Sequence, residues 1–239
     1  METGILYIIA TPIGNLEDMT FRSIRILKEE IDIACCEDTR QTKKLFDNYG
    51  IKLQMRPLHS HSSESVINTV INELLAGKNV AYLSDSGTPS ISDPGSRLIN
   101  AARSNDIKVS PIPGASALTA LASVAGFPEK QIVFSGFLSK KEGKRITELT
   151  NLKQSGGIII IYESPYRIKK LLLAISKVFP GGKILIGREM TKFFEEFLSG
   201  TIEEVIANID NLKEKGEFAV AVYADEKKNK SSDDYEKNC

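Results

Sequence analysis

Charged side chains follow several of the apolar runs in this sequence. Glu37 and Arg40 stand in "EDTR" after one apolar run, Asp85 opens "DSGTP" after another, and Glu163 and Arg167 stand in "ESPYR" after a third. A carboxylate can accept a proton or position a hydroxyl, and a guanidinium can bind phosphate. These five residues are therefore candidates for acid–base chemistry on a phosphate-bearing substrate. For each pair of a glutamate and an arginine, the alternative is a local ion pair.

A further mixed-charge cluster, "GREMTK", contains Arg188 and Lys192. Both cations are candidates for stabilising a negative oxygen or a phosphate, and the alternative is a solvated edge with surface salt bridges. Other acidic and hydroxyl residues fit helix starts better. Asp38 before Gln41, Asp93 before Pro94 and Ser164 before Pro165 are predicted to be helix caps. We therefore assign Asp93 a structural role. Asp85 is assigned a functional one, because a carboxylate at the carboxyl end of a strand can hold an amine or a hydroxyl, and the alternative is an Asx-turn that only shapes the loop.

The elements that must position these residues alternate between strands and helices in the first half of the chain. Such alternation predicts an α/β fold with a largely parallel sheet, whose carboxyl edge gathers the polar loops into one cleft. The predicted strands are 5–10, 31–36, 79–83 and 108–112, and the predicted helices are 21–30, 65–76 and 97–104.

The second half predicts a mixed or antiparallel sheet, because its apolar runs lie closer together and two of them are suited to a hairpin. Strands are expected in "QIVFSGF", "GGIIIIY", "KILIGRE", "FFEEFLSG" and "EFAVAVYA", and helices near 142–153, 165–178 and 202–213. We predict two domains, 1–114 and 115–225. Residues 226–239 are charged and without apolar periodicity, which is typical of a disordered tail.

Composition excludes several classes of protein. Of 239 residues, 31 are Lys or Arg and 31 are Asp or Glu, so an RNA-binding surface must be a local basic patch. The sequence has neither GxxxxGK[ST] nor GxGxxG, which disfavours a nucleotide triphosphatase. His59 and His61 lack neighbouring ligands, so no metal site is predicted. No apolar run is long enough to span a bilayer and no signal peptide is visible, so a cytoplasmic location without membrane contact is expected.

The ordered motifs resemble those of a known family. "TPIGNLEDMT", "EDTR", "SDSGTPSISDPG", "PGASAL", "YESPYR", "GREMTKFFEE" and "KGEF" occur between Thr11 and Phe218 in the order found in the ribosomal RNA small subunit methyltransferase I family, a branch of the tetrapyrrole methylases. The resemblance implies a two-domain fold with the cofactor cleft between a parallel-sheet and a mixed-sheet domain. It also implies a homodimer that uses S-adenosylmethionine to methylate a cytidine 2'-hydroxyl of 16S ribosomal RNA in the 30S subunit.

By similarity to the same superfamily, small and apolar residues of the loops would line the cofactor site. The alternative for each residue is an ordinary turn or the start of a helix. The expected cofactor-binding residues are Pro12, Ser86, Gly87, Thr88, Ile91, Ser116, Ala117 and Met190.

RNA contact would require a basic surface, for which the candidates are the stretches 139–145, 167–170 and 42–44. Phe193 and Phe194 are possible stacking surfaces for an unpaired base, but burial in the protein is the favoured expectation for both. Two other functions remain open. One is a methylase of the same fold that acts on a tetrapyrrole or a protein side chain, and the other is a nucleoside-binding module without catalysis.

Overall fold

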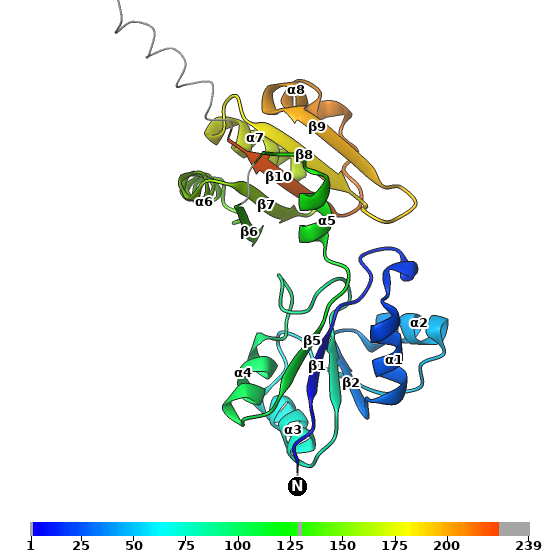
Figure 1. The fold of residues 1–239 in the computed structure, drawn as a ribbon. Coiled ribbons are helices and arrows are strands. Elements are labelled where there is room, and N and C mark those ends of the chain that lie inside the picture. The colour runs from blue at the N-terminus through cyan, green and yellow to red at the C-terminus, as the bar shows by residue number, and fades with distance from the viewer. Residues whose placement is uncertain (1, 129–130, 225–239) are drawn as a thin grey trace, which may run out of the picture. The chain divides into compact units, whose positions relative to one another are not determined.

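The computed structural model describes residues 2–128 and 131–224, so the predicted charged tail lies outside the described residues. The chain forms two compact units, Met1–Ala117 and Leu118–Cys239. Each unit contains one five-stranded sheet with its own hydrophobic core (Figure 1). The predicted combination of a parallel and a mixed α/β sheet is confirmed.

The first sheet is entirely parallel and has the order β3-β2-β4-β1-β5. Its central strands are buried along their whole length, which explains why they appear in the sequence as continuous apolar runs. Its strands are β1 (Leu6–Ile9), β2 (Ile33–Cys36), β3 (Gln54–Pro57), β4 (Val80–Leu83) and β5 (Val109–Ile112).

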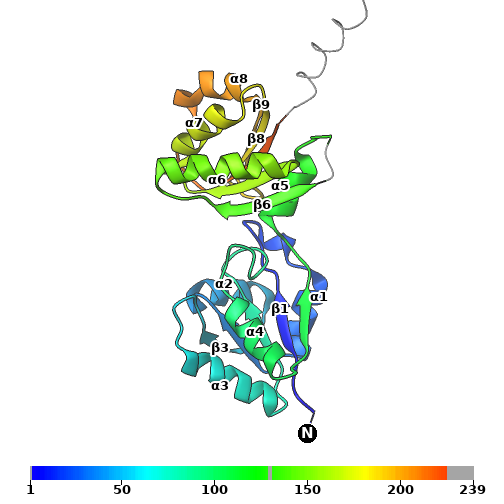
Figure 2. The same ribbon diagram turned by 90° about the vertical axis from the view of Figure 1, so that its left-hand side faces the viewer.

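Helices cover both faces of the first sheet. Leu27 of α1 and Phe46 of α2 pack on one face, and Leu74 of α3 and Leu98 of α4 pack on the other (Figures 1 and 2). This three-layer arrangement leaves the carboxyl ends of the strands free for loops. The helices of this unit are η1 (Leu16–Asp18), α1 (Phe21–Glu29), α2 (Thr39–Tyr49), α3 (Glu64–Leu75) and α4 (Ser96–Ser104).

Strand β3 is the one strand of the first sheet that the sequence analysis does not predict. Its sequence "QMRP" contains a charge and a proline and no apolar alternation. Because β3 pairs only with β2, it is an edge strand, where such residues are tolerated. Arg56 of β3 bonds Glu73 of α3 at 2.9 Å and so ties the edge to the layer of helices.

The second sheet is mixed and has the order β6-β7-β10-β8-β9, in which only β6 and β7 are parallel. The predicted hairpin between β8 and β9 is confirmed by six antiparallel residue pairs, from Lys183 with Thr201 to Arg188 with Glu196. The strands are β6 (Ile132–Phe137), β7 (Ile158–Glu163), β8 (Lys183–Arg188), β9 (Glu196–Thr201) and β10 (Phe218–Tyr223).

Helices α6, α7 and α8 gather on one face of this sheet, where Leu149, Leu171 and Ile202 join the core (Figure 2). Leu121 of α5 lies beside Gly187 of β8. The helices are α5 (Ala117–Val124), α6 (Glu142–Ser155), α7 (Ile168–Val178), α8 (Ile202–Ala207) and η2 (Ile209–Asn211). Within residues 2–128 and 131–224, no helix has both the length and the apolar character needed to cross a membrane.

Candidate functional site

The loops at the carboxyl edge of the first sheet are joined by backbone hydrogen bonds. Thr11, after β1, and Gly87, after β4, exchange two N–H···O bonds of 2.9 and 3.1 Å. The Thr88 hydroxyl donates to the carbonyl of Ala115, after β5, at 3.1 Å. Three loops that are distant in sequence therefore form one bonded assembly around the centre of the sheet.

The loop from Ser84 to Gly95 holds an unusual backbone conformation. Ser90 and Ser92 have φ angles of 68° and 65°, in the left-handed region that non-glycine residues rarely adopt. Gly95 has a φ of 135°, and a Cβ on it would lie 2.8 Å from the Tyr82 ring. Residues held in such conformations cluster at ligand-binding and catalytic sites. The loop is therefore fixed by its contacts in a shape that exposes Asp85 and Ser86.

Three carboxyl groups interact at this edge. Burial raises the pKa of Glu37 to about 7, helped by the negative charges of Asp93 and Asp85 and opposed by a bond from the Asp85 backbone N–H. Burial and the charge of Asp85 raise the pKa of Asp93 to about 6. Asp85 itself accepts a bond of 3.0 Å from the Asp38 backbone N–H. This acidic cluster thus contains a carboxyl group that titrates near neutral pH.

Asp38 and Arg40 form a separate pair next to this cluster. The Asp38 side chain caps α2 by accepting from the Arg40 backbone N–H at 2.8 Å, which confirms the predicted cap. The Arg40 guanidinium donates to both Asp38 oxygens, at 3.0 and 2.7 Å, and these bonds hold the pKa of Asp38 down to about 2. Arg40 therefore neutralises Asp38 and leaves Glu37 without a cationic partner among the described residues.

The predicted helix cap at Asp93 is wrong. Helix α4 begins at Ser96, its N-cap is Gly95, and no side chain bonds its first N–H groups. The left-handed Ser92 and the positive φ of Gly95 bend the loop, so that Asp93 is half-buried near Glu37 and Asp85. Sequence reasoning missed Asp93 as a site residue because Asp-Pro-Gly fits a helix start equally well.

The expected cofactor residues of the first unit lie on the three bonded loops. Gly114 approaches Ala10 so closely that a Cβ on it would lie 2.9 Å from the Ala10 side chain, and Gly87 has a positive φ of 78°. Both positions require glycine, because Gly114 leaves no room for a side chain and Gly87 adopts a conformation in which side chains are strained. Of the expected set, Pro12, Ser86, Gly87, Thr88, Ile91, Ser116 and Ala117 belong to this unit, and Met190 belongs to the other.

Glu163 and Arg167 form an ion pair in the second unit. The Glu163 carboxylate is buried, and its Oε2 lies 3.0 Å from Arg167 Nη2, which also donates to the Leu138 carbonyl at 2.6 Å. The predicted helix cap at Ser164 is wrong, since α7 begins at Ile168 and Ser164 instead donates its backbone N–H to Glu163. This geometry favours a structural role for the pair.

Arg188 and Lys192 hold the loop between β8 and β9. Arg188 donates to Glu196 at 2.8 Å and to the Phe194 and Lys215 carbonyls, while Lys192 bonds Glu189 and Glu217. Both cations are thus occupied by contacts within the protein. Met190 is buried on the same loop, with its sulfur against Gly187.

The expected burial of Phe193 and Phe194 is wrong. The two rings are 93% and 66% exposed and contact each other edge to face at a centroid distance of 5.0 Å. The bonds of Arg188 and Lys192 fix the loop in a turn that points both rings away from the core. The predicted basic stretch 139–145 loses one of its exposed cations, because Arg145 is buried and donates to the Ser139 and Lys140 carbonyls.

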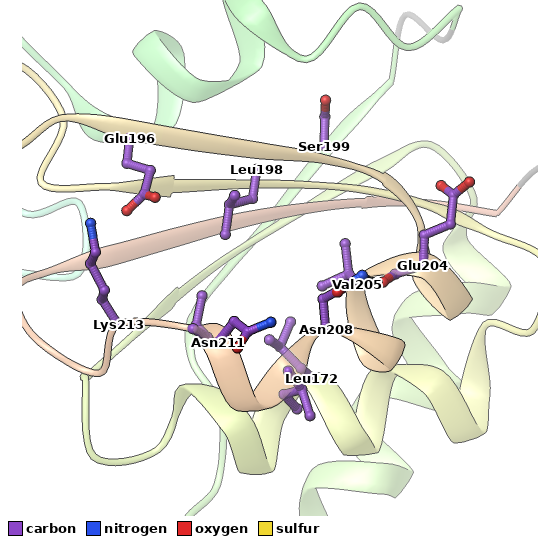
Figure 3. A pocket seen from close by; sticks show the side chains of 11 residues that line it. Leu172, Glu196, Leu198, Ser199, Glu204, Val205, Asn208, Asn211 and Lys213 are labelled. Atoms are coloured by element: carbon purple, nitrogen blue, oxygen red, sulfur yellow. Dashed lines mark hydrogen bonds between the residues drawn. The ribbon is translucent and has the colours of Figure 1, made fainter.

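A hollow of about 550 Å³ lies in the second unit and contains none of the predicted site residues. Figure 3 shows Leu172 and Val205 on its apolar side, Glu196 and Lys213 at one end, and Ser199 and Glu204 at the other. No unpaired buried polar atom of the described residues points into it. Across residues 2–128 and 131–224, no group of three His, Cys, Asp or Glu side chains is arranged to hold a metal ion.

Several proteins are similar in sequence to this chain over nearly its whole length. The chain is 43% identical over 217 residues to ribosomal RNA small subunit methyltransferase I of Leptospira biflexa, covering 91% of this chain and 90% of the relative. It is 42% identical to the protein of the same name from Borrelia garinii, covering 91% and 98% of the two chains. The Bacillus subtilis protein of that name is 43% identical, with 92% and 75% covered.

Solved structures share the fold at low sequence identity. The cobalt precorrin-4 methyltransferase CbiF superposes with a TM-score of 0.67 at 16% identity, covering 91% of this chain and 94% of the other. Uroporphyrin-III C-methyltransferase from Thermus thermophilus, complexed with S-adenosylhomocysteine, gives a TM-score of 0.62 at 14% identity, covering 91% and 96%. The profile of the tetrapyrrole (corrin/porphyrin) methylases matches residues 5–206. The chain therefore belongs to the tetrapyrrole methylase family, in its branch of ribosomal RNA small subunit methyltransferase I.

Proposed function

We propose that this protein uses S-adenosylmethionine to methylate the 2'-hydroxyl of a cytidine in 16S ribosomal RNA of the small subunit. The names of its relatives support ribosomal RNA as the substrate. The observation that carries the proposed chemistry is Glu37, a half-buried carboxyl without a cationic partner among the described residues, whose pKa is raised to about 7. A base with a pKa near the working pH suits transfer to a hydroxyl.

In the proposed reaction, Glu37 accepts the proton of the ribose hydroxyl as the oxygen forms its bond to the methyl carbon. S-adenosylmethionine supplies a methyl group already activated by its sulfonium, and the carbon–sulfur bond breaks with its electron pair going to sulfur. Proton removal by a positioned base typically contributes about 10²-fold to 10⁴-fold to the rate. Alignment of the two reacting atoms can contribute still more, roughly 7 kcal/mol of barrier reduction.

The bonded loops of the first unit are proposed to hold the cofactor. Backbone groups near Pro12, Ser86 and Thr88 would bind its polar atoms, with Gly87, Ile91, Ser116, Ala117 and Met190 as further contacts. The Asp85 carboxylate is exposed and suits an ammonium group or a ribose hydroxyl. Asp93 is proposed to act through Glu37, because its negative charge helps to keep the pKa of Glu37 high.

The remaining candidates receive supporting roles in this proposal. Arg40 remains a candidate for RNA phosphate because its side chain is 87% exposed. Glu163, Arg167, Arg188 and Lys192 are proposed to shape the loops that carry other contacts. The family resemblance extends the proposal to a cytoplasmic homodimer. Light scattering coupled to size-exclusion chromatography would test the dimer.

The decisive experiment measures transfer of labelled methyl groups to 30S subunits from a strain that lacks the modification, followed by mapping of the label. We expect one 2'-O-methylated cytidine, and Glu37→Gln should abolish most of the transfer. Label on a base or on a ribosomal protein would show a methylase of another specificity. Binding of S-adenosylmethionine without transfer to 30S subunits or to a tetrapyrrole would indicate a nucleoside-binding module.

A further inference from the structure

Two loops of the second unit lie side by side at one edge of its sheet. Strands β6 and β7 are parallel, so the loops that follow them, 138–141 and 164–167, leave the sheet at the same edge. Arg167 joins them by donating to the Leu138 carbonyl at 2.6 Å. Buried Arg145 and the carboxylate of Glu148 bond the first loop from behind, at Ser139. The two loops therefore form one rigid surface.

Two aromatic side chains are exposed on this surface. Phe137, the last residue of β6, is 57% exposed, and Tyr166 is 86% exposed. The Phe137 ring contacts Tyr162 in an edge-to-face arrangement with a centroid distance of 6.0 Å. Exposed aromatic rings are typical of surfaces that stack on unpaired bases.

Three lysines in or next to these loops have no carboxylate partner among the described residues. Lys140 and Lys141 lie in the first loop and Lys170 in the first turn of α7, and all three are exposed. No ion pair to any of them occurs among the described residues. The neighbouring acids are engaged elsewhere, since Glu163 pairs with Arg167 and Glu142 with Lys177. The local charge of this edge is therefore positive, although the chain as a whole is neutral.

We propose that Phe137, Lys140, Lys141, Tyr166 and Lys170 form a docking surface for single-stranded RNA of the substrate. We call these five residues the aromatic–lysine patch. The rings would stack on unpaired bases while the lysines contact the adjacent phosphates, a combination that binds single strands with little dependence on sequence. This inference rests on the proposed function, because it assigns the patch to the RNA that is methylated.

The charge contribution is tested with the triple variant Lys140→Gln/Lys141→Gln/Lys170→Gln. Its matched control is Lys52→Gln/Lys78→Gln/Lys108→Gln, which removes three exposed charges from the first unit. Binding to protein-free 16S ribosomal RNA is measured as a function of salt. Each lost phosphate contact reduces the magnitude of the slope of log K against log salt by about 0.7. The magnitude of the slope should therefore fall by about 2 for the patch variant and stay unchanged for the control.

The stacking contribution is tested with Tyr166→Ala, matched to Phe21→Ala, which removes a ring of similar exposure on α1. Tyr166→Ala should weaken RNA binding about fivefold or more, with an unchanged salt slope. Circular dichroism and binding of S-adenosylmethionine, measured for every variant, should match the wild type. These two measurements exclude misfolding as the cause of any loss.

Each outcome decides the proposal. Equal RNA binding by the patch variants and their controls, with methyl transfer by the wild type intact, would overturn the patch and leave the proposed function standing. A loss of binding to 30S subunits but not to protein-free RNA would show that the patch contacts a ribosomal protein, which also overturns it. A wild type that neither binds nor methylates ribosomal RNA would refute the proposed function itself.

Discussion

Two glutamates lie at the carboxyl ends of buried strands in this molecule, and their environments are opposite. Glu37 directly follows β2 in the first unit, and Glu163 is the last residue of β7 in the second. Each is followed within four residues by an arginine. Arg167 pairs with Glu163 at 3.0 Å, whereas Arg40 bonds Asp38 and leaves Glu37 facing Asp85 and Asp93. The same local pattern thus produces a neutralised carboxylate in one unit and a titratable one in the other.

The difference shows how each sheet edge is suited to a different task. At the edge of the first sheet, Glu37, Asp85 and Asp93 have no cationic partner among the described residues, which favours proton transfer and the binding of a cationic cofactor. At the edge of the second sheet, internal pairs neutralise the acids and lysines remain exposed, which favours binding of a polyanion. The comparison therefore supports the proposed chemistry in the first unit and the proposed RNA docking in the second.

The largest effect is expected from Glu37→Gln, which removes the proposed base while keeping the size of the side chain. We expect methyl transfer to 30S subunits to fall by about 10²-fold to 10⁴-fold. Binding of S-adenosylmethionine should stay within a few-fold of the wild type, because the cofactor loops are unchanged. Glu163→Gln is the matched control in the comparison: a greater loss of transfer per folded molecule for Glu163→Gln would reverse the assignment of roles.

The next effect concerns stability and the second glutamate. Arg167→Leu leaves the fully buried Glu163 carboxylate without its partner, and breaking such a pair typically costs about 3 kcal/mol or more of unfolding free energy. Urea denaturation followed by circular dichroism measures this loss. Arg40→Leu is the matched control, since its pair with Asp38 is exposed to solvent and should contribute little. Similar midpoints for the two variants would show that the buried pair is not a structural element.

The contrast between these sites sets the limit of what sequence predicts here. The sequence predicted nine of the ten strands found in residues 2–128 and 131–224. The clearest signals came from β1, β2 and β4, which are buried along their whole length and therefore appear as continuous apolar runs. Strand β3 was not predicted, because its sequence "QMRP" carries no strand pattern of its own. It is stabilised by pairing with β2 and by the Arg56–Glu73 ion pair, and the local sequence indicates neither. The hairpin of β8 and β9 was predictable from their short connection.

The site was predictable in its loops but not in its partners. The motifs placed Glu37 and Asp85 at the same sheet edge, and the structure has both there. The role of Asp93 depends on left-handed Ser92 and on Gly95 packing against Tyr82, which are tertiary features. Arg40 pairs with Asp38 because Asp38 is held in place as the cap of α2. Sequence spacing alone would also allow Arg40 to pair with Glu37.

A smaller effect is expected in the pH profile of methyl transfer. Glu37 must be deprotonated to act as a base, and its pKa is raised to about 7. The value of kcat/KM should therefore rise about tenfold per pH unit below pH about 7 and level off above it. The residual activity of Glu37→Gln should lack this rise. A profile of Glu37→Gln with the same midpoint as the wild type would assign the titration to another group.

The smallest effect separates Asp93 from a helix cap. Its pKa is raised to about 6, so the folded protein binds its proton more tightly than the unfolded chain, and the unfolding free energy must decrease as the pH rises from about 4 to about 6. Asp93→Asn removes that decrease. The variant should be more stable than the wild type by on the order of 1 kcal/mol at about pH 8 and equally stable at about pH 4, measured by urea denaturation. Asp47→Asn, which removes an exposed carboxylate paired with Lys43, is the matched control. A cap would respond in the opposite direction, since its loss destabilises the protein most where the carboxylate is charged. A variant less stable than the wild type at about pH 8 would therefore restore the cap and remove Asp93 from the acidic cluster that distinguishes the first unit from the second.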